Sequence, residues 1–124
     1  MKEQKILIVE DETSLTKILK SKLEKEGYAV LSAINGEKGL DMALKEKPDL
    51  ILLDIVMPRM DGYEMLNKLR KDTWGKNVPV IILTNLTEPK EISNGVSMDI
   101  KDYLVKTDWS LNEVINKVKK RLEK

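Results

Sequence analysis

Short apolar runs alternate along the chain with longer segments in which apolar residues recur three or four positions apart. The runs lie at residues 6–9, 28–31, 50–53, 80–83 and 103–105. Three of them are almost continuous Ile, Leu and Val, which is typical of strands buried on both faces of a parallel sheet. The alternation therefore predicts a strand followed by a helix, five times over.

The helical segments show their spacing as apolar stripes, each on one face of a helix. The stripes are Leu15, Ile18, Leu19 and Leu23; Leu40, Ala43 and Leu44; Met65, Leu66 and Leu69; and Leu111, Val114, Ile115, Val118 and Leu122. Gly27 is expected just beyond the end of the first helix. Ser110 and Glu113 form a capping-box pattern at the start of the last one. Residues 88–98 are also expected to be helical, although Pro89 and Gly95 interrupt their pattern.

This order of elements predicts one α/β domain over residues 1–124. A repeated strand–helix alternation favours an open parallel sheet with helices on both faces. For five strands we expect the flavodoxin-like (βα)5 doubly wound fold with strand order 2-1-3-4-5.

Composition narrows the chemistry. The chain has no Cys and no His, so thiolate chemistry, histidine-based catalysis and histidine or cysteine metal sites are excluded. Its 22 basic and 21 acidic residues give a net charge of +1, which provides no general attraction to nucleic acid or membrane. No apolar run is long enough for a signal peptide or a transmembrane helix, so we expect a soluble cytoplasmic protein.

Reactive side chains follow four of the five predicted strands. Glu10 and Asp11 follow the first, Asp54 the third, Thr84 the fourth and Lys106 the fifth. In an open α/β sheet, ligands bind beyond the carboxyl ends of the strands near the point where the winding reverses. Strands 1 and 3 flank that point, about 4.8 Å apart, so Asp11 and Asp54 should face each other with Glu10 close by.

Clustered carboxylates repel each other, by roughly 3 kcal/mol for two charges about 5 Å apart at an effective dielectric near 20. A cation would hold them together, and a compact all-oxygen site with few protein ligands suits Mg²⁺. Lys106 adds a positive charge and Thr84 a hydroxyl donor. Together these groups fit phosphoryl transfer to a carboxylate nucleophile. Each alone is more often a turn, cap or solvated residue, so the interpretation rests on their joint placement.

The sequence closely resembles the response-regulator receiver family of two-component signalling, including CheY-like single-domain receivers. The resemblance covers nearly the whole chain. It is carried by the acidic pair Glu10-Asp11, the strand ending at Asp54, the following loop Met57-Pro58-Arg59-Met60-Asp61-Gly62, Thr84, and the segment Asp102-Tyr103-Leu104-Val105-Lys106.

The resemblance implies a role for each matching residue. Asp54 would accept a phosphoryl group from a phosphohistidine on a sensor histidine kinase or phosphotransfer protein. Mg²⁺ would be bound by Asp11, Asp54 and the backbone carbonyl of Val56, with Glu10 acting through a metal-bound water. Lys106 would pair with Asp54 and then with the phosphoryl group.

A switch is implied as well. Thr84 would move to hydrogen-bond the phosphoryl oxygen, and Tyr103 would swing inward behind it. This change would reshape the surface formed by the fourth helix, fifth strand and fifth helix, which binds a downstream protein target. Such a protein is a phosphoacceptor that assists its own phosphorylation and dephosphorylation, and is not a conventional enzyme.

Three positions depart from the family pattern without removing a reacting group. Thr107 stands where proline is usual after the lysine, Asn85 where a small residue is usual, and Asp99-Ile100 where Gly-Ala is usual. The first two are expected to affect kinetics.

We expect three kinds of partner: a sensor histidine kinase or phosphotransfer protein, a downstream protein target, and a second copy of the chain in a phosphorylation-linked homodimer. We expect no contact with membrane and no direct contact with nucleic acid. Nucleic acid is excluded because no helix-turn-helix segment remains once the five βα units are assigned.

The main alternative is a pseudo-receiver, an interaction module of the same fold that is never phosphorylated; it would require the loss of a reacting residue. A flavodoxin would need a Ser, Thr or Gly-rich phosphate loop where Glu10-Asp11-Glu12 stands. A phosphohydrolase with an Asp nucleophile would want a second acid at Val56.

We predict a long-lived phosphoryl group. In the family, the side chains two residues after the phosphoacceptor and two after the threonine influence hydrolysis. Here these are Val56 and Leu86, which cannot orient an attacking water. Val56→Asn should therefore accelerate loss of the phosphoryl group, measured by intact mass over time. An unchanged rate would rule this explanation out.

Overall fold

The computed structural model describes residues 4–54, 62–84, 102–105 and 111–122. Its elements follow in the order β1 (Lys5–Val9), α1 (Thr13–Lys25), β2 (Ala29–Ala33), α2 (Gly36–Glu46), β3 (Leu50–Asp54), α3 (Gly62–Arg70), β4 (Val80–Thr84), β5 (Asp102–Val105) and α5 (Leu111–Leu122). The helix expected at residues 88–98 and the cap expected at Ser110 lie outside the described residues.

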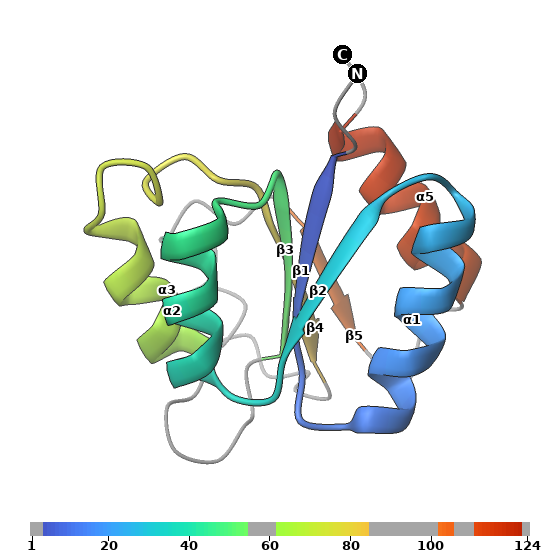
Figure 1. The fold of residues 1–124 in the computed structure, drawn as a ribbon, viewed down its shortest axis with the longest axis horizontal. Coiled ribbons are helices and arrows are strands. Elements are labelled where there is room, and N and C mark those ends of the chain that lie inside the picture. The colour runs from blue at the N-terminus through green and yellow to red at the C-terminus, as the bar shows by residue number, and fades with distance from the viewer. Residues whose placement is uncertain (1–3, 55–61, 85–101, 106–110, 123–124) are drawn as a thin grey trace.

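The five strands form one parallel sheet in the order β2-β1-β3-β4-β5 (Figure 1). This confirms the predicted flavodoxin-like order. β1 and β3 are direct neighbours, with Val9 opposite Leu53, and β3 pairs with β4, with Asp54 opposite Leu83. The carboxyl ends of β1, β3 and β4 therefore meet at one edge of the sheet.

Helices cover both faces of the sheet, with α1 and α5 on one side and α2 and α3 on the other (Figure 1). Alternate strand residues enter the two layers: Leu7, Val9, Ile51 and Leu53 pack under α2 and α3. Ile6, Ile8, Leu50 and Leu52 pack under α1 and α5. All eight are fully buried, which explains why the strands read as continuous apolar runs.

The helical stripes are confirmed only in part. Met65, Leu66 and Leu69 of α3 are fully buried, as are Val114 and Val118 of α5. Ile18 of α1 and Leu44 of α2, however, are 46% and 37% exposed. These two residues belong to the apolar stripes by their spacing, yet the core does not cover them.

The ends of α1 and α2 are fixed by local bonds. Gly27 has a φ of 99°, and its N–H donates to the carbonyl of Glu24 while the Tyr28 N–H donates to that of Leu23. This is the Schellman arrangement, which confirms Gly27 just beyond the end of α1. Asn35 caps α2 by accepting a hydrogen bond from the Lys38 N–H at 2.9 Å.

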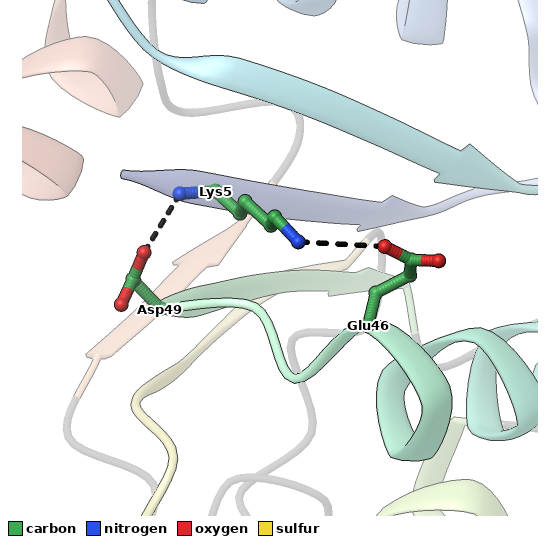
Figure 2. A network of polar contacts seen from close by, with 3 residues as sticks. All are labelled: Lys5, Glu46 and Asp49. Carbon is green, nitrogen blue, oxygen red and sulfur yellow. Dashed lines mark hydrogen bonds and ion pairs between the residues drawn. The ribbon is translucent and has the colours of Figure 1, made fainter. Parts of the chain in front are cut away.

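A polar cluster holds the opposite, amino edge of the sheet, where the strands begin. The backbone N–H of Lys5 donates to the Asp49 carboxylate at 2.7 Å, and its ammonium pairs with Glu46 at 3.4 Å (Figure 2). These contacts join the starts of β1 and β3 to the end of α2. They fix the register of the two strands that carry the acidic residues at the other edge.

The connection from α3 to β4 has its own network. Arg70 donates to the carbonyls of Gly75 at 2.7 Å and Val78 at 2.9 Å, and Asp72 accepts from the N–H groups of Trp74 and Gly75. A Cβ atom at position 75 would lie 2.2 Å from the Leu69 carbonyl, so this position requires glycine.

Within the described residues, no helix has the length and apolarity needed to cross a membrane.

At the junction of α1 and α5, Lys119 forms an ion pair with Glu26 next to Tyr28. Burial raises the pKa of the Tyr28 hydroxyl above its usual value, although the charge of Lys119 partly opposes this. The hydrogen bond to Glu26 raises the pKa of Lys119. Both groups therefore bind protons more tightly in the folded state than in the unfolded state.

These raised pKa values predict a loss of stability at alkaline pH. The contribution of these two protonated groups to the free energy of unfolding is complete below the ordinary pKa near 10. It falls as the pH rises toward the folded-state pKa values. Tyr28→Phe should make the decline of the unfolding free energy above pH 10 shallower, as measured by urea titration at several pH values. Wild type and variant compared at pH 7 to 8, where Tyr28 is protonated, provide the baseline. Parallel declines above pH 10 would contradict the assignment.

Candidate acidic metal and phosphoacceptor site

Three carboxylates gather at the carboxyl edge of the sheet. Glu10 and Asp11 directly follow β1, and Asp54 is the last residue of the neighbouring β3. One carboxylate oxygen from each lies within 4.8 Å of the others. The predicted cluster is therefore present in the fold.

The three acids differ in their access to water. Glu10 is 1% exposed and Asp54 4% exposed, whereas Asp11 is open to solvent. Burial removes the water that would screen the charges of Glu10 and Asp54, so their mutual repulsion is stronger than at a surface. Of the three acids, Asp11 is therefore the one in contact with solvent.

Local bonds hold Glu10 in place. Its backbone N–H donates to the carbonyl of Ala33 at 3.0 Å, which continues the pairing of β1 with β2 by one residue. Its side-chain oxygen accepts from the Glu12 N–H at 3.2 Å. That contact bends the chain out of β1 into α1 and fixes the carboxylate near Asp54.

Helix α2 packs closely over the end of β1. A Cβ atom at position 39 would lie 2.8 Å from both methyl groups of Val9 and 3.2 Å from the sulfur of Met65. Glycine at this position thus lets α2 sit directly on the residue that precedes Glu10.

The buried Asn35, which caps α2 two residues after Ala33, was not singled out from the sequence. Its position before a helical segment was the available signal, since Asn is a preferred N-cap residue.

The other predicted site residues are described less completely. Thr84 ends β4, one residue beyond the Leu83 that lies opposite Asp54, so its backbone lies at the expected edge. Tyr103 lies in β5, with its backbone opposite Ile82. Val56 and Lys106 fall outside the described residues. The roles assigned to all of these residues remain predictions.

The donor set suits a hard divalent cation. Carboxylate oxygens are the ligands that Mg²⁺ and Ca²⁺ prefer, and a cation would neutralise charges that otherwise repel. One exposed and two buried acids can bind such an ion while leaving part of its coordination to water or to a ligand. The arrangement can therefore hold a cation against a carboxylate nucleophile.

Comparison with known proteins identifies the family. Residues 6–119 match the family described as response regulator receiver domain. The chain belongs to this family. The receiver domain is a signalling module, and its fold agrees with solved structures. A chemotaxis protein CheY4 from Vibrio cholerae superimposes with a TM-score of 0.90 at 28% identity, covering 98% of this chain and 100% of that one.

A second solved receiver domain belongs to sensor histidine kinase PA1611 from Pseudomonas aeruginosa, described with a magnesium ion coordinated in the active-site cleft. It has a TM-score of 0.87 at 27% identity and covers 99% of this chain and 100% of that one.

Curated relatives include the probable transcriptional regulator ycf27 of Porphyridium aerugineum, 37% identical over all of this chain and 51% of that protein. Another is the DNA-binding dual master transcriptional regulator RpaA of Synechocystis, 32% identical over 97% of this chain and 49% of that protein. The receiver domain described here thus spans about half the length of these relatives.

These relatives correct one expectation. The exclusion of nucleic acid from the partners is wrong, because the similar proteins are transcriptional regulators and one is named as DNA-binding. The exclusion considered only the elements within 124 residues, whereas the relatives are about twice as long.

Repulsion within the cluster makes a prediction about stability. In the presence of a chelator, Asp54→Asn should raise the unfolding free energy by roughly 1 to 3 kcal/mol, because it removes one of the crowded charges. A divalent cation should stabilise the wild type by mass action and the variant much less. Urea titration with and without the cation measures both effects.

Asp49→Ala is the matched control at the other end of β3. It removes the acceptor of the Lys5 N–H and should lower stability regardless of the cation. If Asp54→Asn also lowered stability in chelator, the repulsion argument would be wrong.

Proposed function

We propose that this receiver domain accepts a phosphoryl group on Asp54 from a phosphohistidine of a sensor histidine kinase. The proposal is carried by one observation: Asp54 is a buried carboxylate at a strand end, within 4.8 Å of two other acids that can share a cation with it. Family membership supports it, and so does the retention of Thr84 and Lys106 in the sequence.

The cation in this proposal is Mg²⁺. Asp11, Asp54 and the backbone carbonyl of Val56 would bind it, and Glu10 would act through a water. When bound, it would neutralise charge on the phosphoryl oxygens and on the acidic cluster. The magnesium ion in the PA1611 receiver domain supports this choice over other hard cations.

The chain's own residues supply the rest. A carboxylate oxygen of Asp54 attacks phosphorus as the bond to the donor imidazole nitrogen breaks, and that nitrogen keeps the electron pair. Lys106 holds a phosphoryl oxygen by charge, and Thr84 donates a hydrogen bond to another. Burial of Asp54 excludes bulk water from the new acyl phosphate. The protein takes part in its own modification and is not a conventional enzyme.

The output is a change of surface. Movement of Thr84 toward the phosphoryl group, with Tyr103 turning in behind it, would reshape the surface around β5, α5 and the chain between β4 and β5. Phosphorylation would thus bias a two-state element by a local change of charge. By likeness to the relatives, we infer that this surface controls a longer regulator that acts on DNA.

The test is transfer from a small phosphodonor. The protein is incubated with acetyl phosphate, with and without Mg²⁺, and its intact mass is recorded. We expect a single phosphoryl adduct that requires Mg²⁺ and disappears in Asp54→Asn. The control Asp49→Asn changes the same residue type at the opposite end of β3 and should keep the adduct.

An adduct that persisted in Asp54→Asn would place the modification elsewhere. No adduct from acetyl phosphate or from a histidine-kinase donor would favour the pseudo-receiver instead. That alternative has no present support, since Glu10, Asp11 and Asp54 are all retained and gathered together.

A further inference from the structure

Charge is separated along the strand direction of the described domain. At the carboxyl edge lie the acidic cluster and the acids of the first helical turns, Glu37, Glu64 and Glu113. At the amino edge, the ends of the helices and the connection from α3 to β4 carry basic residues. They are Lys22, Lys25, Lys45, Lys47, Lys68, Arg70, Lys71, Lys76, Lys119, Lys120 and Arg121.

Helix electrostatics explains part of this pattern. Acidic residues are favourable at helix N-termini and basic residues at C-termini. Because all the strands are parallel, the helices that cover the sheet run in the same direction. Their N-termini, which favour acidic residues, lie at one edge of the sheet, and their C-termini, which favour basic residues, lie at the other. Lys71 and Lys76 lie outside any helix, however, so the helix dipole does not account for them.

Of the acids that the structure describes at the amino edge, four are engaged in contacts, whereas Glu24 is exposed. Glu26 pairs with Lys119, Glu46 pairs with Lys5, and Asp49 accepts from the backbone of Lys5. Asp72 accepts from two backbone N–H groups of its own loop. Lys25, Lys45, Lys47, Lys71 and Lys76 are all exposed. The edge therefore presents a surplus of exposed positive charge although the chain as a whole is nearly neutral.

We propose that this amino edge binds the phosphate backbone of duplex DNA. Exposed lysines gathered at one edge of a nearly neutral domain fit a polyanion without sequence preference. DNA is chosen over other polyanions because the proposed function, on which this inference rests, places the domain in a regulator that acts on DNA. The acidic carboxyl edge would repel the duplex and so orient the domain with Asp54 away from it.

The two edges are electrically independent at physiological salt. From Leu50 to Asp54, β3 spans about 13 Å at roughly 3.3 Å per residue, which exceeds a Debye length of about 8 Å. A phosphoryl group on Asp54 would therefore change DNA binding by this edge little.

The test measures binding of the chain to a fluorescein-labelled 20-base-pair duplex of arbitrary sequence by anisotropy, at 50 and 200 mM NaCl. If about three phosphates are contacted, affinity should fall by about 40-fold between these salt concentrations. The variant Lys25→Gln/Lys47→Gln/Lys76→Gln should weaken binding at 50 mM NaCl at least tenfold.

The matched control is Lys17→Gln/Lys20→Gln/Lys38→Gln. It removes the same charge from exposed lysines nearer the middle or the start of α1 and α2. It should change affinity less than threefold, and unfolding curves should establish that both variants are folded. If both variants lost the same DNA affinity, the effect would come from net charge alone and the proposal would be overturned.

Two further outcomes also decide the question. Absence of binding at 50 mM NaCl would overturn the proposal, and so would binding to poly-glutamate as tight as binding to DNA. None of these measurements uses phosphorylation, and Asp54→Asn should bind DNA as the wild type does at 200 mM NaCl, where the Debye length is shorter than the distance between the edges. A failed DNA surface is therefore distinguishable from a failed phosphoacceptor.

Discussion

The burial of β1 and β3 between two layers of core is the constraint on which the acidic site depends. Three carboxylates within 4.8 Å would move apart or take up protons on a flexible chain. Here they are held by two adjacent strands whose apolar side chains are fully buried in two layers of core. The hydrophobic effect that assembles the sheet thus supplies the free energy that keeps like charges together. A cation or a phosphoryl group can then interact with a site formed in advance.

Much of this arrangement could be predicted from the sequence, because a parallel strand that is covered on both faces appears as a continuous run of apolar residues. Runs such as residues 50–53 admit no polar face, and the alternation with helices permits few topologies. Once the strand order is known, the residues at the strand ends must meet at one edge. That is why the sequence alone is enough to group Glu10, Asp11 and Asp54.

Other features have no comparable signal. The apolar spacing of Ile18 and Leu44 matches a buried stripe, yet periodicity does not report how wide a face the sheet covers. The bonds from Arg70 and Asp72 into the α3–β4 connection join side chains to backbone groups whose positions depend on the whole loop. The involvement of nucleic acid was missed because it is suggested by relatives about twice as long as this chain.

The division of the core into two separate clusters has an evolutionary consequence. Among the described residues, those under α2 and α3 and those under α1 and α5 form two separate clusters on opposite faces of the sheet. A lineage can therefore repack one layer, changing the helix surface above it, while the other layer keeps the strands aligned. The acidic residues belong to neither layer, since they stand at the strand ends beyond both. Recognition surfaces in such a fold can diverge quickly around a chemistry that stays fixed.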